Sequence, residues 1–136
     1  MHILILALLT AAGPVEAGEL MCPPELPAST ITVSHPPPDW TGFVPAKLML
    51  NSVGVSLGPL EDRATLIGDY RKRRGGAFTV TFSLEGAKND DRWLMCQYGS
   101  SNDIVIAKRL ARSLTTCAVS YVPIRFGDNT ITIACR

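Results

Sequence analysis

The sequence contains 136 residues, of which 46% are hydrophobic and 18% are charged, and its formal net charge is +1. These values are typical of one soluble globular domain. So small a net charge argues against a general nucleic-acid-binding protein. The only long apolar stretch lies at the extreme N-terminus, which argues against stable insertion into a membrane. Composition therefore excludes more functions than it identifies.

The N-terminus has the features of a secretory signal peptide. Residues 3–12 (ILILALLTAA) form a short, mostly apolar run, and Val15-Glu16-Ala17 places small residues around one cleavage position. The run is too short to span a membrane, which takes about 20 residues, and Pro14 would end any helix that continued. A buried N-terminal helix is the alternative. We expect cleavage after Ala17 and export of residues 18–136 to the periplasm as a single disulfide-bonded β domain.

Four cysteines follow the predicted cleavage position: Cys22, Cys96, Cys117 and Cys135. An even number of cysteines in an exported domain predicts two disulfides, for which three connectivities are possible. Cys22 could instead carry the lipid of a lipoprotein. However, Met21 is not the small residue that such signals place before the cysteine. Soluble export with two disulfides is the better interpretation.

The first half of the exported chain alternates between proline-rich and strand-like sequence. Residues 22–40 contain six prolines, so only residues 30–34 are expected to pair, as a short edge strand. Residues 47–57 place apolar side chains close to alternation, and a slip at residues 51–52 predicts a bulge or tight turn. Residues 59–66 (PLEDRATL) predict a two-turn helix, because proline begins it and two acidic residues lie in its first turn.

The second half predicts a series of strands. A basic loop at residues 70–76 is followed by residues 77–85, in which apolar and polar side chains alternate as in a half-buried strand. Four more strands are expected, at residues 92–98, 104–110, 116–122 and 130–135, and they predict an antiparallel meander. The predicted fold is mainly β, an antiparallel sandwich or open barrel of about seven strands with one short helix. An α+β fold is the alternative.

One hairpin register bears on the disulfides. A turn centred on Phe126 pairs Tyr121 with Ile131 and Cys117 with Cys135, all on one face. Residues directly opposite each other in neighbouring strands lie within disulfide reach. The preferred connectivity is therefore Cys117 with Cys135 and Cys22 with Cys96. The rival pairs Cys96 with Cys117 and Cys22 with Cys135, and it requires the meander to fold into two layers.

Several short motifs in this order resemble a family of small exported proteobacterial proteins of uncharacterised function. The motifs are Cys22-Pro23, Pro38-Asp39-Trp40, VSLGPLEDRATL at residues 55–66, Trp93-Leu94-x-Cys96-x-Tyr98, Val105-x-Ala107-Lys108-x-Leu110 and Cys117-x-Val119-x-Tyr121. Some members resemble proteins encoded beside contact-dependent toxin delivery systems. The resemblance thus implies a candidate immunity protein that binds and blocks a toxin acting in the periplasm.

The exported chain is poor in residues for catalysis. His35 is its single histidine, so any Ser-His or Cys-His mechanism would have to use that residue. Oxidised cysteines supply neither a thiolate nucleophile nor zinc ligands. Asp90 and Asp91 are adjacent in KNDDR and are typical of a solvated turn. We therefore predict no catalytic residue, no metal site and no cofactor.

Two features are candidates for binding a partner. The densest charged run is Arg71-Lys72-Arg73-Arg74, next to Tyr70, and a second basic group comprises Lys108, Arg109 and Arg112. Such runs are usually solvated surface, but in an exported protein they could also face an acidic protein or an envelope glycolipid. Trp40 follows three prolines, and it could either cap the core or anchor an interface.

The sequence thus predicts a periplasmic, non-enzymatic binding protein, an immunity or inhibitor protein that blocks a toxin or a cell-wall enzyme. Its predicted partner-binding residues are Trp40, Tyr70, Arg71, Lys72, Arg73 and Arg74. The alternative function is an accessory envelope protein that binds glycan or glycolipid through its basic loops.

Overall fold

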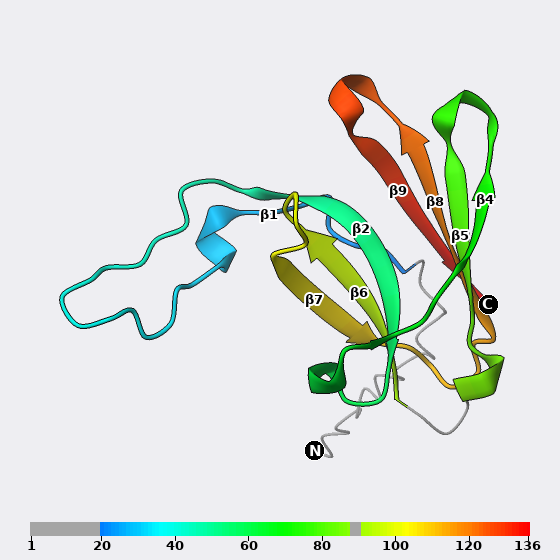
Figure 1. Ribbon diagram of the computed structural model, residues 1–136, viewed down its shortest axis with the longest axis horizontal. Helices are drawn as coiled ribbons and strands as arrows, with labels where there is room; N and C mark the ends of the chain where they lie inside the picture. The colour runs from blue at the N-terminus through cyan, green and yellow to red at the C-terminus, as the bar shows by residue number, and fades with distance from the viewer. Residues whose placement is uncertain (1–19, 88–90) are drawn as a thin grey trace, which may run out of the picture.

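The computed structural model describes residues 20–87 and 91–136, which form nine strands in two antiparallel sheets (Figure 1). The first sheet contains β1 (Glu25–Leu26), β2 (Leu48–Leu57), β6 (Arg92–Tyr98) and β7 (Ile104–Arg109) in that order, and β3 (Ala64–Thr65) pairs with the end of β2. The predicted signal peptide lies outside the described residues. No helix in the described part of the chain is long and apolar enough to cross a membrane.

The second sheet has the order β4 (Asp69–Lys72), β5 (Phe78–Ser83), β8 (Thr116–Pro123) and β9 (Asn129–Cys135). It packs on the first sheet, and the predicted mainly β sandwich is confirmed, with nine strands where about seven were expected. Alternation places one side chain in two from each central strand in the core. The fully or almost fully buried core residues include Val53, Val55, Leu94, Cys96, Tyr98, Phe82, Cys117, Val119, Tyr121 and Ile133.

The two sheets are joined through a tyrosine. The Val53 backbone N–H in β2 donates to the Tyr121 hydroxyl at 3.0 Å, and this hydroxyl donates to the Val53 carbonyl at 3.3 Å. Burial raises the pKa of Tyr121 above its usual value, and the bond to the Val53 backbone offsets part of that rise. Tyr121 thus satisfies backbone groups of a strand in the opposite sheet, where no strand pairs with them.

Arg92 makes the second connection between distant segments. Its side chain is 1% exposed. The guanidinium donates from Nη1 to the carbonyls of Leu84 at 3.3 Å and Leu114 at 2.9 Å, and from Nη2 to the Ala111 carbonyl at 3.0 Å. The polar sequence around Arg92 gave no sign that this residue would be buried. It holds the end of β5 against the segment that carries the chain from β7 to β8.

The predicted meander is wrong, because the four C-terminal strands divide between the sheets. The β6–β7 hairpin extends β2, whereas the β8–β9 hairpin extends β5. Residues 110–115 cross from one sheet to the other, and Leu110, 4% exposed, lies in the core at the start of this crossing. Local alternation predicts strands but not the sheet to which each strand is added.

Two other local predictions are also wrong. Residues 59–66 form a single 3₁₀ turn, Leu60–Asp62, instead of a helix, and Arg63 ends the turn in the left-handed region at φ 51°. The chain then doubles back, so that β3 pairs with β2. Residues 30–34 are not an edge strand either. A 3₁₀ turn at Ala28–Thr30 precedes unpaired extended chain, and the edge is taken by β1.

Both disulfides have the preferred connectivity. Cys22 is bonded to Cys96 and Cys117 to Cys135, with Cα atoms 5.7 Å and 4.0 Å apart. The β8–β9 register is also as predicted, since Cys117 lies opposite Cys135 and Tyr121 opposite Ile131. The rival connectivity is therefore wrong, although the chain does fold into two layers. The predicted irregularity in β2 is confirmed as a register shift between Leu50 and Ser52.

Candidate functional site

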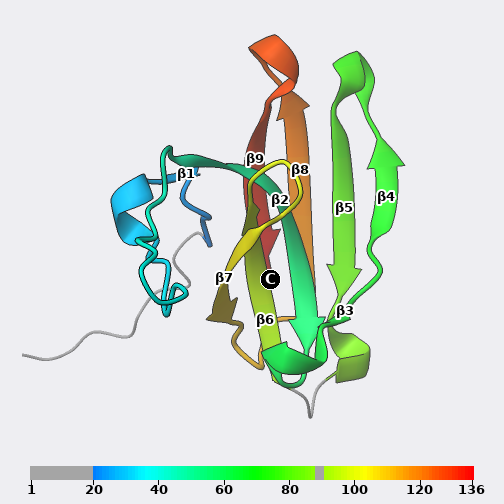
Figure 2. The ribbon, with the colours of Figure 1, turned by 60° about the vertical axis from the view of Figure 1, so that its left-hand side comes forward.

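Two hairpin loops lie together at one end of the second sheet (Figure 1). The β4–β5 loop spans residues 73–77 and the β8–β9 loop spans residues 124–128. A Cβ added to Gly76 would lie 3.4 Å from Pro123 Cγ, which places the two hairpins in contact. Figure 2 also shows that both loops project beyond the first sheet, so no second layer covers them. We call the exposed basic, aromatic and branched apolar residues of these hairpins the tip surface: Tyr70, Arg71, Lys72, Arg73, Arg74, Val122, Ile124, Arg125 and Phe126.

The four basic residues predicted to bind a partner, Arg71, Lys72, Arg73 and Arg74, lie on this tip surface and are exposed. Arg71 Nε donates to the Asp69 carboxylate at 3.2 Å, and both side chains are largely in solvent, so this pair contributes little stability. Arg125 from the second hairpin adds a fifth cation, which the sequence analysis did not include. The carboxylates of these two hairpins belong to Asp69 and Asp128, so the tip surface has a positive balance.

Aromatic side chains connect the tip surface to the core. Tyr70 is 58% exposed. Its ring lies 5.2 Å from that of Phe78, which in turn stacks on Tyr121 at 4.4 Å. The inner end of this row, Tyr121, is buried, and the outer end meets solvent. Tyr70 therefore packs against an aromatic neighbour while more than half of it is exposed, which favours a role in contact.

Phe126 is the residue that the sequence analysis missed. It was placed at the centre of the hairpin turn and given no role. Its side chain is 97% exposed at the tip of the β8–β9 loop, and its backbone has φ 67°. The signal that could have found it is a large aromatic residue at a turn position that favours glycine.

Trp40 does not join the tip surface. It is 73% exposed on the loop between the Ala28–Thr30 turn and β2, and Phe43 on the same loop is 77% exposed. In Figure 1 this loop extends away from both sheets, on the side opposite the β4–β5 hairpin. The interpretation of Trp40 as a cap of the core is therefore wrong, and Trp40 and the basic loop are separate surfaces.

One residue of the second basic group, Arg109, makes structural contacts. The Arg109 guanidinium lies 4.9 Å from the centre of the Trp93 ring and 3.5 Å from the Asp91 carboxylate. The Trp93 indole N–H donates to the Gly58 carbonyl at 3.0 Å. These interactions hold Arg109 against the first sheet. Its side chain remains 62% exposed, and Lys108 and Arg112 are exposed as well.

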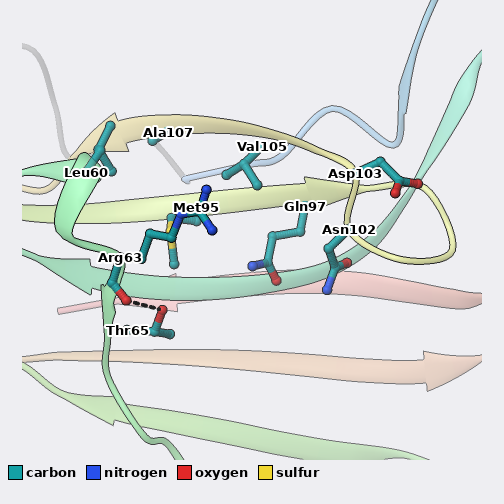
Figure 3. Close-up of a pocket in the computed structure, with 9 residues that line it drawn as sticks. All are labelled: Leu60, Arg63, Thr65, Met95, Gln97, Asn102, Asp103, Val105 and Ala107. Atoms are coloured by element: carbon teal, nitrogen blue, oxygen red, sulfur yellow. Dashed lines mark hydrogen bonds between the residues drawn. The ribbon is translucent and has the colours of Figure 1, made fainter.

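A groove of about 590 Å³ lies on the outer face of the first sheet (Figure 3). Its polar residues are bonded to neighbouring side chains of β2: the Ser52 hydroxyl donates to Gln97 Oε1 at 2.6 Å, and the Asn51 side-chain amide donates to Asn102 Oδ1 at 2.9 Å. Asn102 Oδ1 also lies 3.1 Å from the Ser52 hydroxyl oxygen. The rest of its lining is Leu60, Arg63, Thr65, Met95, Asp103, Val105 and Ala107. The side chains of Gln97 and Asn102 therefore hold β2, β6 and the β6–β7 loop together.

The described residues show no arrangement for metal chemistry. No three His, Cys, Asp or Glu side chains among residues 20–87 and 91–136 lie close enough to hold a metal ion. His35 is exposed on the proline-rich loop, and all four cysteines are in disulfides. Asp91 pairs with Arg109, whereas Asp90 lies outside the described residues.

A disulfide-linked β sandwich whose basic and exposed apolar side chains gather on projecting hairpins has the structure of a binding domain. The family model of the type VI secretion system Tli immunity proteins matches residues 45–136, more than half of the chain. The chain belongs to this family and is an immunity protein, which inhibits a toxin. No curated protein and no solved structure matches it. The matched segment contains both hairpins of the tip surface.

Proposed function

We propose that this protein binds a type VI secretion toxin in the periplasm and blocks it by occupying its surface, without catalysing a reaction. The family match over residues 45–136 carries the proposal. The tip surface supports it, because arginine and aromatic side chains are enriched in protein interfaces. Inhibition of this kind is stoichiometric, so one inhibitor molecule is consumed for each toxin molecule.

The disulfides support the periplasmic location. Bonds such as Cys22–Cys96 and Cys117–Cys135 form and persist in oxidising compartments and are rare in the cytosol. Fractionation and mass spectrometry of the intact protein test the location. We expect a periplasmic protein that begins at Gly18 and carries no lipid. Its mass should be lower than that of the reduced chain by the four hydrogen atoms that two disulfides lose. A cytoplasmic protein, or one lipidated at Cys22, would contradict this part of the proposal.

We propose that the toxin contacts Tyr70, Arg71, Lys72, Arg73 and Arg74 on the tip surface. All five are exposed, and Tyr70 is backed by a stacked aromatic row. Trp40 is proposed as a second contact from its own loop, which would reach a different part of the toxin.

Protection of toxin-sensitive cells tests the function. A type VI secretion toxin is expressed in the periplasm of these cells, with and without this protein. We expect growth to be restored in proportion to the inhibitor and a 1:1 complex to elute in size-exclusion chromatography. Continued killing at excess inhibitor, together with the absence of a complex, would reject the function.

A further inference from the structure

The two loops of the tip surface have the same backbone conformation. A backbone hydrogen bond closes each loop, from Arg73 N–H to the Ala77 carbonyl at 2.7 Å and from Ile124 N–H to the Asp128 carbonyl at 2.9 Å. Each loop also has two successive residues at positive φ. They are Gly75 and Gly76 in the first loop, at 68° and 78°, and Phe126 and Gly127 in the second, at 67° and 79°. The same turn is thus built twice, and the two sequences can be compared position by position.

The comparison isolates Phe126. The equivalent residue in the first loop is Gly75, and their ψ angles are 28° and 26°. The left-handed region crowds a Cβ against the following carbonyl, so glycine is favoured there and asparagine is the best tolerated alternative. A phenylalanine at this position costs conformational energy. Because its side chain is 97% exposed, packing within the fold does not offset that cost.

A strained residue with no role in the fold indicates a role in function. Phe126 stands beside Arg125 and close to Ile124, which is 55% exposed, and the neighbouring hairpin adds the cations of residues 71–74. Interface anchors are typically aromatic side chains and arginines at the centre of a contact. The arrangement is an almost fully exposed ring on a pair of hairpins whose cations outnumber their carboxylates.

We infer that Phe126 is the central anchor of the toxin contact and enters an apolar recess that is rimmed by carboxylates on the toxin. The inference rests on the proposed function and names the surface and the chemistry of its partner. Charge complementarity selects an acidic partner, since five cations on these hairpins outnumber the two carboxylates of Asp69 and Asp128.

The ring and the charges have different kinetic roles. Exposed cations speed the encounter with an acidic surface, and salt screens this effect. The buried ring slows dissociation, because removing it from its recess exposes apolar surface again. Rising salt should therefore lower the association rate of the wild-type protein, whereas removal of the ring should raise the dissociation rate and leave the salt dependence intact.

Phe126→Gly tests the anchor, because it copies the residue that the first loop has at the equivalent position. Binding to the toxin against which the wild-type protein protects is measured by surface plasmon resonance at two salt concentrations. We expect Phe126→Gly to weaken binding on the order of 30-fold, mainly through faster dissociation. The melting temperature should stay the same or rise, because the strain is relieved. Phe126→Asn should behave in the same way.

The chain offers matched controls. Ile67→Ser removes a side chain that is also 97% exposed but lies outside the tip surface, and it should leave affinity unchanged. Arg125→Glu should slow association and weaken its dependence on salt. Lys108→Glu, the same charge change on an exposed residue of β7, should do much less.

The outcomes separate this inference from the proposed function. Protection by the wild-type protein with unchanged affinity of Phe126→Gly would overturn the anchor and leave the function intact. Loss of protection by the wild-type protein would reject the function itself. Flotation with vesicles of phosphatidylglycerol and phosphatidylethanolamine is measured alongside. Binding to vesicles that requires Phe126, combined with unchanged toxin affinity, would show a membrane contact instead and would also overturn the inference.

Discussion

The two disulfides close loops of very different length, and their contributions to stability should differ accordingly. The bonded cysteines are 74 residues apart in Cys22–Cys96 and 18 apart in Cys117–Cys135. Loss of chain entropy in the unfolded state gives about 4.4 kcal/mol for the long loop and about 3.2 kcal/mol for the short one. Replacement of Cys22 and Cys96 by alanine should therefore cost about 1.2 kcal/mol more than the same change at Cys117 and Cys135.

The comparison is matched because each double variant removes two sulfur atoms from the protein interior. Cys22, Cys96 and Cys117 are buried and Cys135 is half-buried, so the cavity terms largely cancel. Without its disulfide, the N-terminal segment keeps other contacts. The Tyr98 hydroxyl donates to the Pro23 carbonyl at 2.8 Å, and Leu50 N–H donates to the Pro24 carbonyl at 2.9 Å.

Urea unfolding of the wild type and both double variants, followed by circular dichroism, gives the free energies of unfolding. The reasoning would be refuted if the two variants were equally stable or if loss of Cys117–Cys135 cost more. Unfolding of the wild type in dithiothreitol is the control. It should be less stable than either double variant, because reduction breaks both bonds at once.

Three further predictions concern the buried polar side chains of the fold. Arg92→Met should lower the free energy of unfolding by about 3–5 kcal/mol, because three backbone carbonyls lose a charged donor, and Arg92→Lys should restore only part of this in urea unfolding. Tyr121→Phe should cost about 1–3 kcal/mol by calorimetry, since the buried Val53 N–H and carbonyl lose their partner. Burial raises the pKa of Tyr98 and Tyr121 above 10 in the folded protein. Their stabilising effect should therefore be complete below about pH 10 and decline as the pH rises through the folded values, with a flatter alkaline profile in Tyr121→Phe.

Local sequence was sufficient to predict secondary structure and register where a short segment sets its own geometry. Alternation predicted the strands that begin at Phe78 and Thr116, and the turn centred on Phe126 fixed a register that placed Cys117 opposite Cys135. It failed at residues 59–66, where a helical pattern gave way to pairing with β2. Few of these residues contact the core, so their own preference was weak compared with hydrogen bonds to an existing strand.

The same distinction applies to the candidate site. The sequence shows the positive charge of the basic run at residues 71–74, but it does not show which residues lie beside that run in the fold. Its neighbour at Phe126 is separated from it by about fifty residues of sequence, and only the pairing of β5 with β8 brings the two hairpins together. Trp40, chosen because three prolines precede it, lies on a different surface.

The export signal stays a prediction from the sequence. The sequence by itself was enough for the β class and for the β8–β9 register, because both follow from composition or from residues close along the chain. That register pairs Cys117 with Cys135 and leaves Cys22 for Cys96. The tertiary structure alone decided which sheet each hairpin joins, that Arg92 is buried and which loops meet at the tip surface. These depend on contacts between residues far apart in sequence, and no local pattern specifies such contacts.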